Sequence, residues 1–250
     1  MTSSQLRANA REALKGKWGK AALITLIYVI VTFVIQFVLS FIPVFGSIAL
    51  FVISMPLSYG LLVTFVKLKR SEEVSYTGFF NFGFSQFSKV WSVFGNMVLK
   101  LIVPLILLVV SIMLMVFGGA GAIVGAAFNT ASATAGFSGI TIIGLIGYIA
   151  SLIYLVVKGY LYSLSYYILN DNPDKSGKEI VEESEKLMQG NRWNFFWLGL
   201  TFIGWTILSA FTLYIGILWL MPYIMVTFVC FYESLAGTKG DVESTPVSEN

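Results

Sequence analysis

The 250-residue sequence contains no histidine and a single cysteine, Cys230. Imidazole and thiolate groups are the usual ligands of transition metals, so we do not expect a site for such a metal. The same shortage excludes a catalytic triad built on histidine or cysteine, because Cys230 lies in an apolar run with no base nearby. An internal disulfide would need a second cysteine.

Other chemical signatures are missing as well. No segment matches the phosphate-binding pattern G-x-x-x-x-G-K-[ST], and the carboxylates offer no evident acid–base pair. We therefore predict that the protein is not an enzyme, with no catalytic residues, no cofactor and no metal. No nucleic-acid partner is expected.

Charge is scarce and unevenly placed. Only 12% of the residues are charged and 57% are hydrophobic, which is too apolar for a soluble domain. The charged residues fall within the stretches 1–20, 67–100, 158–192 and 233–250, and the apolar blocks between them do not alternate like barrel strands. The sequence therefore predicts an all-α fold, a polytopic transmembrane helical bundle that forms a single domain over residues 1–237.

The apolar blocks divide into six predicted transmembrane helices of roughly 20 residues each. Lys and Arg collect on the cytoplasmic side of membrane proteins, and five basic residues precede the first span, so both termini are predicted to be cytoplasmic. The first span is longer than a signal-peptide core and no small-x-small site precedes Pro43, which predicts an uncleaved helix. The predicted spans are Ala21–Ile42, Ser47–Val66, Ser92–Phe117, Ile140–Val157, Phe195–Leu213 and Ile215–Leu235.

The spans are expected to pair as three helical hairpins that open and close on the charged side. Pro43–Gly46 and the stretch around Leu213–Gly216 form short external turns. Residues 118–139 are an uncharged run rich in Gly, Ala, Ser and Thr, and the sequence leaves open whether this run is a loop or an extension of the helices. The polar residues 238–250 are expected to be a disordered cytoplasmic tail.

An amphipathic interfacial helix is predicted before each hairpin. In the first, apolar residues four apart lie beside a basic flank, a pattern typical of a helix that lies in the membrane interface. We expect this helix to contact anionic lipid head groups at the cytoplasmic face. Its apolar face is Leu6, Ala10, Leu14 and Trp18, and the expected lipid contacts are Arg7, Arg11, Lys15 and Trp18.

The segments before the other two hairpins have different sequence patterns. Ser176 and Glu179 form a capping box before the third hairpin. An aromatic stripe with helical spacing leads into the third span: Phe80, Phe84, Phe87, Trp91 and Phe94. The segments Leu14–Trp18 and Met188–Trp193 both place a glycine just before a tryptophan, which indicates either a triplicated hairpin or convergence on the same membrane entrance.

Three ionisable residues are candidates for function, because an unpaired charge at membrane depth costs several kcal/mol. If its helix continues to Leu169, Lys158 lies about 16 Å inside the cytoplasmic end; if the helix stops near Val157, Lys158 snorkels to the interface. Lys100 lies near the start of the third span. Glu233 lies at the end of the last span, and a pair with Lys158 is a hypothesis. In the snorkelling case an aromatic belt is expected from Tyr160, Tyr162, Tyr166 and Tyr167.

Several segments resemble a known family. They are Ser184–Trp193, Phe202–Trp205, Gly216–Tyr223 and Phe231–Glu233, with Ala10–Trp18 at the start. Together they are similar to the bacterial domain-of-unknown-function 975 family of integral membrane proteins. The resemblance is dense only over residues 184–233. It implies a six-helix fold in a bacterial cell (inner) membrane and no established activity.

These observations predict a non-enzymatic membrane component or accessory subunit whose partners are the bilayer and its anionic head groups. The alternative is a small-solute or lipid transporter, with a path between kinked helices near Lys158. Pro56, Pro104 and Pro222 lie inside predicted spans and could produce such kinks.

Overall fold

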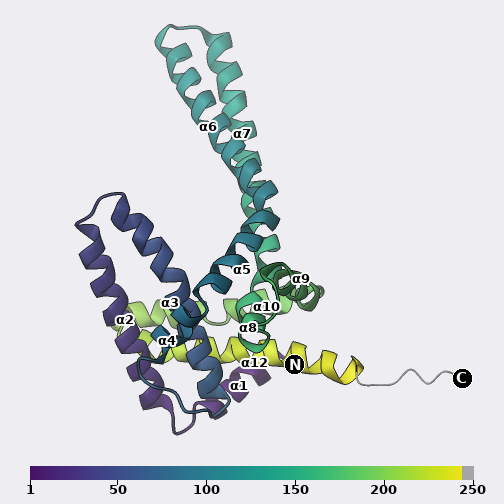
Figure 1. Cartoon of the computed structure of the whole chain (residues 1–250). Coiled ribbons are helices and arrows are strands. Elements are labelled where there is room, and N and C mark those ends of the chain that lie inside the picture. The colour runs from purple at the N-terminus through teal and green to yellow at the C-terminus, as the bar shows by residue number, and fades with distance from the viewer. Residues whose placement is uncertain (244–250) are drawn as a thin grey trace, which may run out of the picture. The chain divides into compact units, whose positions relative to one another are not determined.

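The structure, a computed structural model, describes residues 1–243 and the side chains of residues 1–237 (Figure 1). The described chain is helical and contains no strand, and six of its helices or helical runs are long and apolar enough to cross a membrane. These candidate spans are Trp18–Ser40, Phe45–Lys69, Ile102–Ala127, Ala131–Asp171, Arg192–Phe211 and Ile217–Gly237. The all-α, multi-pass membrane class predicted from the sequence is confirmed.

The helices follow one another with short connections. They are α1 (Ser3–Ala13), α2 (Trp18–Ser40), α3 (Phe45–Lys69), α4 (Gly78–Ser85), α5 (Phe87–Lys100), α6 (Ile102–Ala127), α7 (Ala131–Gly159), a 3₁₀ turn at Tyr160–Tyr162, α8 (Ser165–Asp171), α9 (Gly177–Met188), α10 (Arg192–Leu200), α11 (Ile203–Phe211) and α12 (Ile217–Glu243). The predicted disordered tail, residues 238–250, lies outside the residues whose side chains are described.

The chain divides into two compact units. The first unit is Met1–Phe94 with Ser163–Asn250, and the second unit is Gly95–Tyr162.

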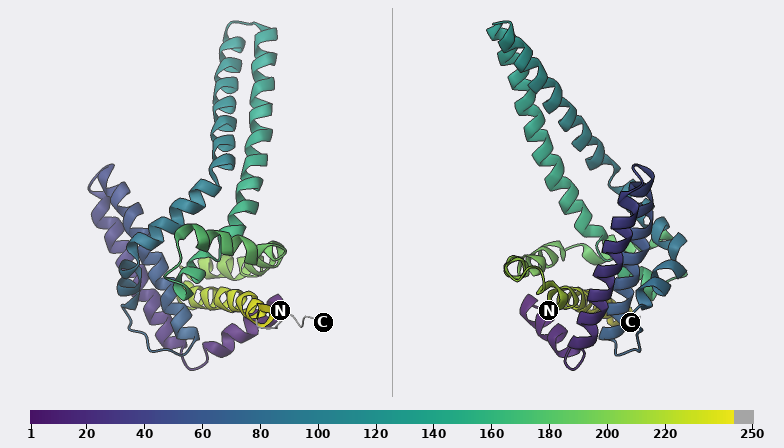
Figure 2. Two further views of the ribbon diagram at one scale, coloured as in Figure 1. Left: turned by 45° about the vertical axis from the view of Figure 1, so that its right-hand side comes forward. Right: turned by 90° about the vertical axis from the view of Figure 1, so that its left-hand side faces the viewer.

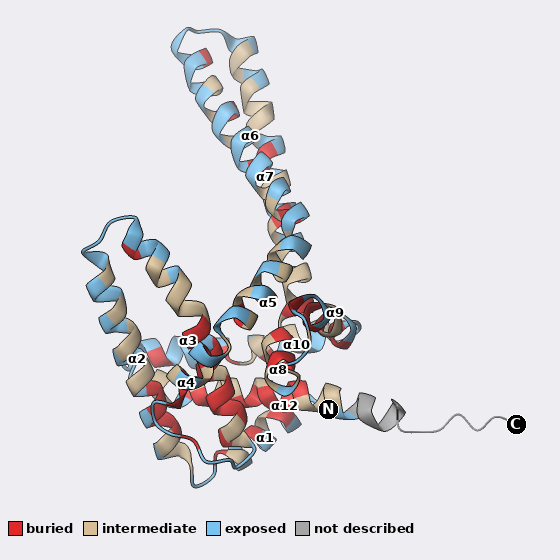
Figure 3. Cartoon of the chain, in the orientation of Figure 1, coloured by how far each residue is buried: buried red, intermediate tan, exposed pale blue. Residues whose placement is uncertain are grey.

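The C-terminal half of α3 is the centre of the first unit. Its residues Leu57, Leu61 and Phe65 are almost completely buried, because α2, α4, α8 and α12 all pack against this helix. Towards the α2–α3 turn the same pair of helices is exposed (Figure 3), and Phe33 on α2 is 66% exposed. Apolar surface of this extent is typical of a face that contacts lipid or another protein, and it agrees with a membrane-spanning pair.

Helix α4 docks on α3 through two glycines. A Cβ atom on Gly60 of α3 would overlap the carbonyl oxygen of Phe79, and a Cβ atom on Gly83 of α4 would overlap the carbonyl oxygen of Pro56. The two backbones therefore touch directly, and Phe79 is fully buried beside them. Glycine inside a helix weakens it by about 0.5–1 kcal/mol relative to alanine, so both residues are explained by this close approach.

Helix α12 lies across the α2–α3 pair, near the start of α2 and the end of α3 (Figures 1 and 2). α1 packs along α12 on the same side. α11 and α12 pack together, as the predicted third hairpin requires, but α12 is not aligned with α2 and α3. A side-by-side bundle of three hairpins therefore stays a prediction.

The second unit is the α6–α7 hairpin. Residues 118–139 extend both helices and turn at Phe128–Thr130, which answers the question that the sequence left open. The helices touch through glycines: a Cβ atom on Gly118 would lie 2.6 Å from the nitrogen of Thr141, and one on Gly144 would lie 2.7 Å from the nitrogen of Met115. With 26 and 29 residues, the helices are about 39 and 43 Å long, which is longer than a bilayer core.

Three predicted segments are interrupted. The fifth span, Phe195–Leu213, is divided between α10 and α11 at residues 201–202. The third span begins at Ile102 rather than Ser92, because α5 ends at Lys100 and Pro104 lies in the first turn of α6. A helix tolerates proline there, since the first N–H groups have no partner within the helix. The aromatic stripe is correspondingly divided between α4 and α5 at Gln86.

Helices are present where the sequence predicted interfacial helices before the first and third hairpins, but the apolar face of α1 is buried in the protein rather than free to face lipid. α1 and α9 both begin with complete capping boxes, at Thr2 and at Ser176. Gly16 and Gly190 both adopt left-handed backbone angles, with φ values of 76° and 81°, just before the helices that follow. The similarity of the two entrances noted in the sequence therefore extends to the backbone, while triplication of the hairpin stays a hypothesis.

Candidate functional site

The basic N-terminal helix α1 has an apolar face fixed by tertiary packing. Thr2 accepts a hydrogen bond from the N–H of Gln5, and the Gln5 side chain accepts one from the N–H of Thr2. Leu6, Ala10 and Leu14 are buried, and the helix packs against α12 and α10. Because one face is held in this way, the direction of the basic face is fixed as well.

Two arginines on α1 carry charge that is not neutralised nearby. Arg7 donates from Nε to the carbonyl oxygen of Ser3 at 3.3 Å, and Arg11 donates from one terminal nitrogen to the Tyr223 hydroxyl at 3.3 Å. Within residues 1–237, no carboxylate pairs with either guanidinium. The two arginines are one helical turn apart, where like charges repel by ~0.2–0.5 kcal/mol. Their remaining N–H donors can donate hydrogen bonds to an anion.

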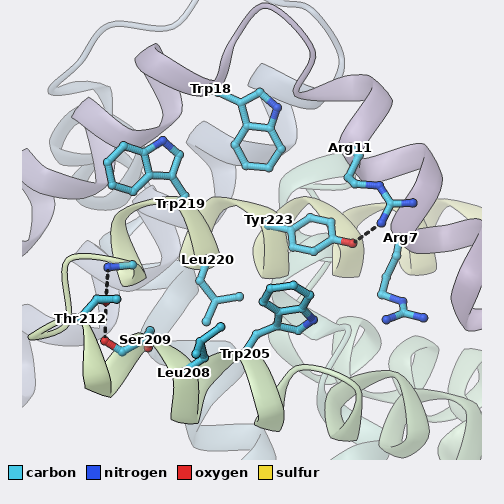
Figure 4. Close-up of a pocket in the computed structure, with 11 residues that line it drawn as sticks. Arg7, Arg11, Trp18, Trp205, Leu208, Ser209, Thr212, Trp219, Leu220 and Tyr223 are labelled. Atoms are coloured by element: carbon cyan, nitrogen blue, oxygen red, sulfur yellow. Dashed lines mark hydrogen bonds between the residues drawn. The ribbon is translucent and has the colours of Figure 1, made fainter.

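These arginines line a cavity of about 380 Å³ between α1, the start of α2, α11 and α12 (Figure 4). We call it the tryptophan pocket, because three tryptophans form most of its aromatic wall. Trp18 contacts the Tyr223 ring at a centroid distance of 6.2 Å. The full lining is Arg7, Arg11, Trp18, Trp205, Leu208, Ser209, Thr212, Gly216, Trp219, Leu220 and Tyr223.

The tryptophan pocket is cationic at one end and apolar elsewhere. Figure 4 shows Arg7 and Arg11 beside Tyr223, with Leu208, Leu220 and Trp219 towards the other end. The hydroxyls of Ser209 and Thr212 donate to carbonyl oxygens three residues earlier: Ser209 to Thr206 at 2.7 Å, and Thr212 to Ser209 at 2.8 Å. The third hydroxyl of the pocket, that of Tyr223, accepts from Arg11. The arginines are the charged groups of the lining, and their remaining N–H donors can bind an anionic ligand.

The pocket exists because α11 and α12 bend back to α1. The sequence placed the turn around Leu213–Gly216 on the opposite side of the membrane from α1. The structure instead brings Thr212 and Gly216 into the same pocket as Arg7 and Arg11. Hydropathy gives the length of an apolar helix but not its direction, so this juxtaposition could not be predicted.

A second polar centre joins α3, α8 and α12, and we call it the charge cluster. Arg70, which follows α3, donates two hydrogen bonds to Asp171 at 2.7 and 2.9 Å and a third to Glu233 at 3.2 Å. Lys69 also pairs with Glu233. The Tyr232 hydroxyl donates to Asp171 at 3.0 Å. Two cations and two carboxylates thus neutralise one another where the ends of α3 and α8 meet α12.

The geometry of the charge cluster indicates a structural role. The hydrogen bonds that Asp171 accepts hold the pKa of Arg70 above its usual value, so its guanidinium stays charged. The side chains of Arg70, Asp171 and Glu233 are only 32%, 25% and 25% exposed. Asp171, the last residue of α8, is thus held between Arg70 and Tyr232. The sequence hypothesis paired Glu233 with Lys158, whereas its two carboxylate oxygens bind Lys69 and Arg70.

Lys100 and Lys158 belong to the second unit. α7 ends one residue after Lys158, at Gly159, so the uninterrupted helix to Leu169 is wrong, and the snorkelling of Lys158 to the interface stays a prediction. The expected aromatic belt does not follow, because Tyr167 is buried against Tyr232 with stacked rings 5.4 Å apart. Lys100 ends α5 and is exposed.

Part of the tryptophan pocket was predicted from the sequence. Arg7, Arg11 and Trp18 were predicted as lipid contacts and line it, whereas Lys15 is exposed in the turn after α1 and does not line it. Periodicity missed its other half, although the signal was present in the segments that carry the family resemblance. Those segments include Trp205, Gly216, Trp219, Leu220 and Tyr223.

Comparisons with known proteins give one match. No curated protein and no solved structure matches the chain. A family described as "Protein of unknown function (DUF975)" matches residues 1–239, which is nearly the whole chain and includes every residue of the tryptophan pocket and the charge cluster. The protein therefore belongs to the DUF975 family.

Proposed function

We propose that the protein is a non-enzymatic component of a bacterial inner membrane, with both termini in the cytoplasm, that associates with anionic lipid through α1. One observation carries this proposal: α1 buries its apolar face in the protein and leaves the charges of Arg7 and Arg11 without a carboxylate partner within residues 1–237. The position of Lys and Arg in the sequence supports the orientation.

The non-enzymatic part of the proposal is supported by the chemistry of two cavities of the first unit. One is the tryptophan pocket. The other, of about 430 Å³, lies between α2 and α3 and is lined by Thr32, Gln36, Ser47, Ser54 and apolar side chains. Neither lining contains a carboxylate, an amine or a thiol, so the serine and threonine hydroxyls there have no general base within the lining. Lys158, the centre of the transport alternative, lines neither cavity, and that alternative gains no support.

The proposal predicts a lipid preference that depends on the basic face of α1. In bilayers of phosphatidylcholine and phosphatidylglycerol, the full-length protein should restrict the motion of spin-labelled phosphatidylglycerol more than that of spin-labelled phosphatidylcholine. Replacing Arg7, Arg11 and Lys15 together with glutamine should remove most of this preference, since each basic residue near an anionic surface contributes about 1 kcal/mol. Electron spin resonance measures the restricted fraction, and added salt should lower it in the unsubstituted protein.

A matched variant separates this effect from net charge. Replacing Lys175, Lys178 and Lys186 with glutamine removes the same charge at and beside α9, and the preference should remain. Equal preference in the α1 variant and the unsubstituted protein would contradict the proposal.

A further inference from the structure

We propose that the tryptophan pocket binds one anionic glycerophospholipid of the surrounding bilayer, with an acyl chain against the tryptophans and the phosphate on Arg7 and Arg11. This inference rests on the proposed function and deepens it. The proposed function requires only that α1 prefers anionic lipid on average, whereas the pocket implies a single retained lipid molecule.

The apolar part of the pocket fits a hydrocarbon chain that enters from the membrane. A cavity of about 380 Å³ falls in the size range of small-molecule sites, roughly 300–1,000 Å³. Its rim residues Trp205 and Leu208 are each 55% exposed. On the same helix, Ile207 and Phe211 are also exposed, so the apolar lining is continuous with surface that faces lipid. This continuity favours a bilayer phospholipid over a dissolved ligand.

The cationic end fits a phosphate group. Arg11 is anchored by its hydrogen bond to the Tyr223 hydroxyl, and Arg7 by its bond to the backbone of its own helix. Each keeps further N–H donors in a planar fork, which binds phosphate oxygens in pairs. An anion between them would also remove the repulsion between two guanidinium groups one turn apart.

The composition of the pocket places it at a membrane–water interface. An unpaired arginine is costly in the hydrocarbon core, whereas tryptophan prefers the head-group level, where its ring is buried and its N–H is hydrated. Trp18, Trp205 and Trp219 meet Arg7 and Arg11 in one cavity. A phospholipid is divided in the same way, because its phosphate lies on the water side of the interface and its acyl chains lie on the hydrocarbon side.

The inference is tested by native mass spectrometry of the full-length protein purified in mild detergent and titrated with phosphatidylglycerol. One phosphatidylglycerol molecule should bind at a low lipid concentration, and further molecules should bind only at much higher lipid concentrations. Dioleoyl phosphatidylcholine should bind at least about tenfold more weakly, because it carries no net charge for the arginines to neutralise. Absence of a first, tighter phosphatidylglycerol would overturn the inference.

The position of the acyl chain is tested by filling that part of the pocket with a larger side chain. Leu208→Trp adds bulk inside the pocket at a half-exposed position, so folding should be retained and binding of the first lipid should fall by about tenfold or more. Ile207→Trp is the matched control, since Ile207 is 56% exposed on the same helix and does not line the pocket. Equal binding by the two variants would overturn the assignment of the chain to this pocket.

The position of the phosphate is tested by removing the charge of one arginine. Arg11→Gln should weaken the first lipid by about tenfold, while Lys178→Gln, which removes one charge from α9, should bind it like the unsubstituted protein. Equal binding by these two variants would show that Arg11 does not hold the head group.

A further arm of the titration distinguishes the source of the ligand. Oleate shares the chain and the negative charge but is not a phospholipid. If oleate binds first and more tightly than phosphatidylglycerol, the phospholipid assignment is wrong. The proposed function is tested separately, by the lipid preference measured in bilayers. If the protein keeps this preference but retains no single lipid in native mass spectrometry, only the present inference is wrong.

Discussion

Replacing Arg70 with alanine is expected to lower the free energy of unfolding by about 3 kcal/mol. The guanidinium makes three hydrogen bonds in the charge cluster, two to Asp171 and one to Glu233. Removing one partner of a buried, hydrogen-bonded pair costs roughly 3–5 kcal/mol, and the partial exposure of this cluster favours the lower end. The variant leaves Asp171 without its main cation at a joint between α3, α8 and α12.

SDS titration of the detergent-solubilised protein measures this loss, and two variants calibrate it. Arg70→Lys keeps the charge but not the bidentate geometry, so an intermediate loss is expected. Lys67→Ala removes an exposed pair with Glu72 and should cost no more than about 1 kcal/mol. A loss in Arg70→Ala no larger than in Lys67→Ala would show that solvent screens the cluster and that it does not hold the helices together.

The elements of the fold were predictable where local chemistry determines them. Uncharged apolar blocks of about 20 residues have few alternatives to membrane helices, and all six were found. The capping box at Ser176 and Glu179 depends on four consecutive residues, and it is present. The boundaries were less predictable, because Pro104 fits equally well inside a kinked span or in the first turn of a new helix.

The sites were only half predictable, because each is made by segments far apart in the sequence. Arg11 and Tyr223 are 212 residues apart, and Arg70 and Asp171 are 101 residues apart. Periodicity gives the face on which a residue lies, as it did for the basic flank of α1, but not which helix meets that face. Both sites depend on α12 lying across α2 and α3, and no local sequence pattern predicts that position.

Charge segregation nevertheless has a structural consequence beyond topology. Lys69 and Arg70 lie in the second charged stretch, Asp171 lies in the third, and Glu233 begins the last. Because these stretches were assigned to one side of the membrane, their ionisable groups can meet and neutralise one another, as the charge cluster does. The arginines of α1 are different, since no carboxylate within residues 1–237 pairs with them.

Replacing Gly60 with alanine should be about as disruptive as breaking the charge cluster, with a loss of about 3 kcal/mol. The added Cβ atom would overlap the carbonyl oxygen of Phe79 and lie 2.8 Å from the nitrogen of Gly83. Both are backbone atoms, so a rotamer change cannot relieve the contact and α4 must move away from α3. Overpacking typically costs 1–3 kcal/mol, and a rigid backbone contact falls at the upper end. SDS titration again gives the free energy.

The matched control reverses the sign of the effect. Gly19 lies inside α2, and a Cβ atom added there would have no neighbour within 4 Å, so Gly19→Ala should stabilise the protein by up to about 1 kcal/mol through helix propensity. Gly83→Ala releases the same α3–α4 contact as Gly60→Ala, so the double variant should lose less than the sum of the two single losses. If Gly60→Ala instead behaved like Gly19→Ala, direct backbone contact between α3 and α4 would be ruled out. In that case Phe79 would have to be buried by side chains alone.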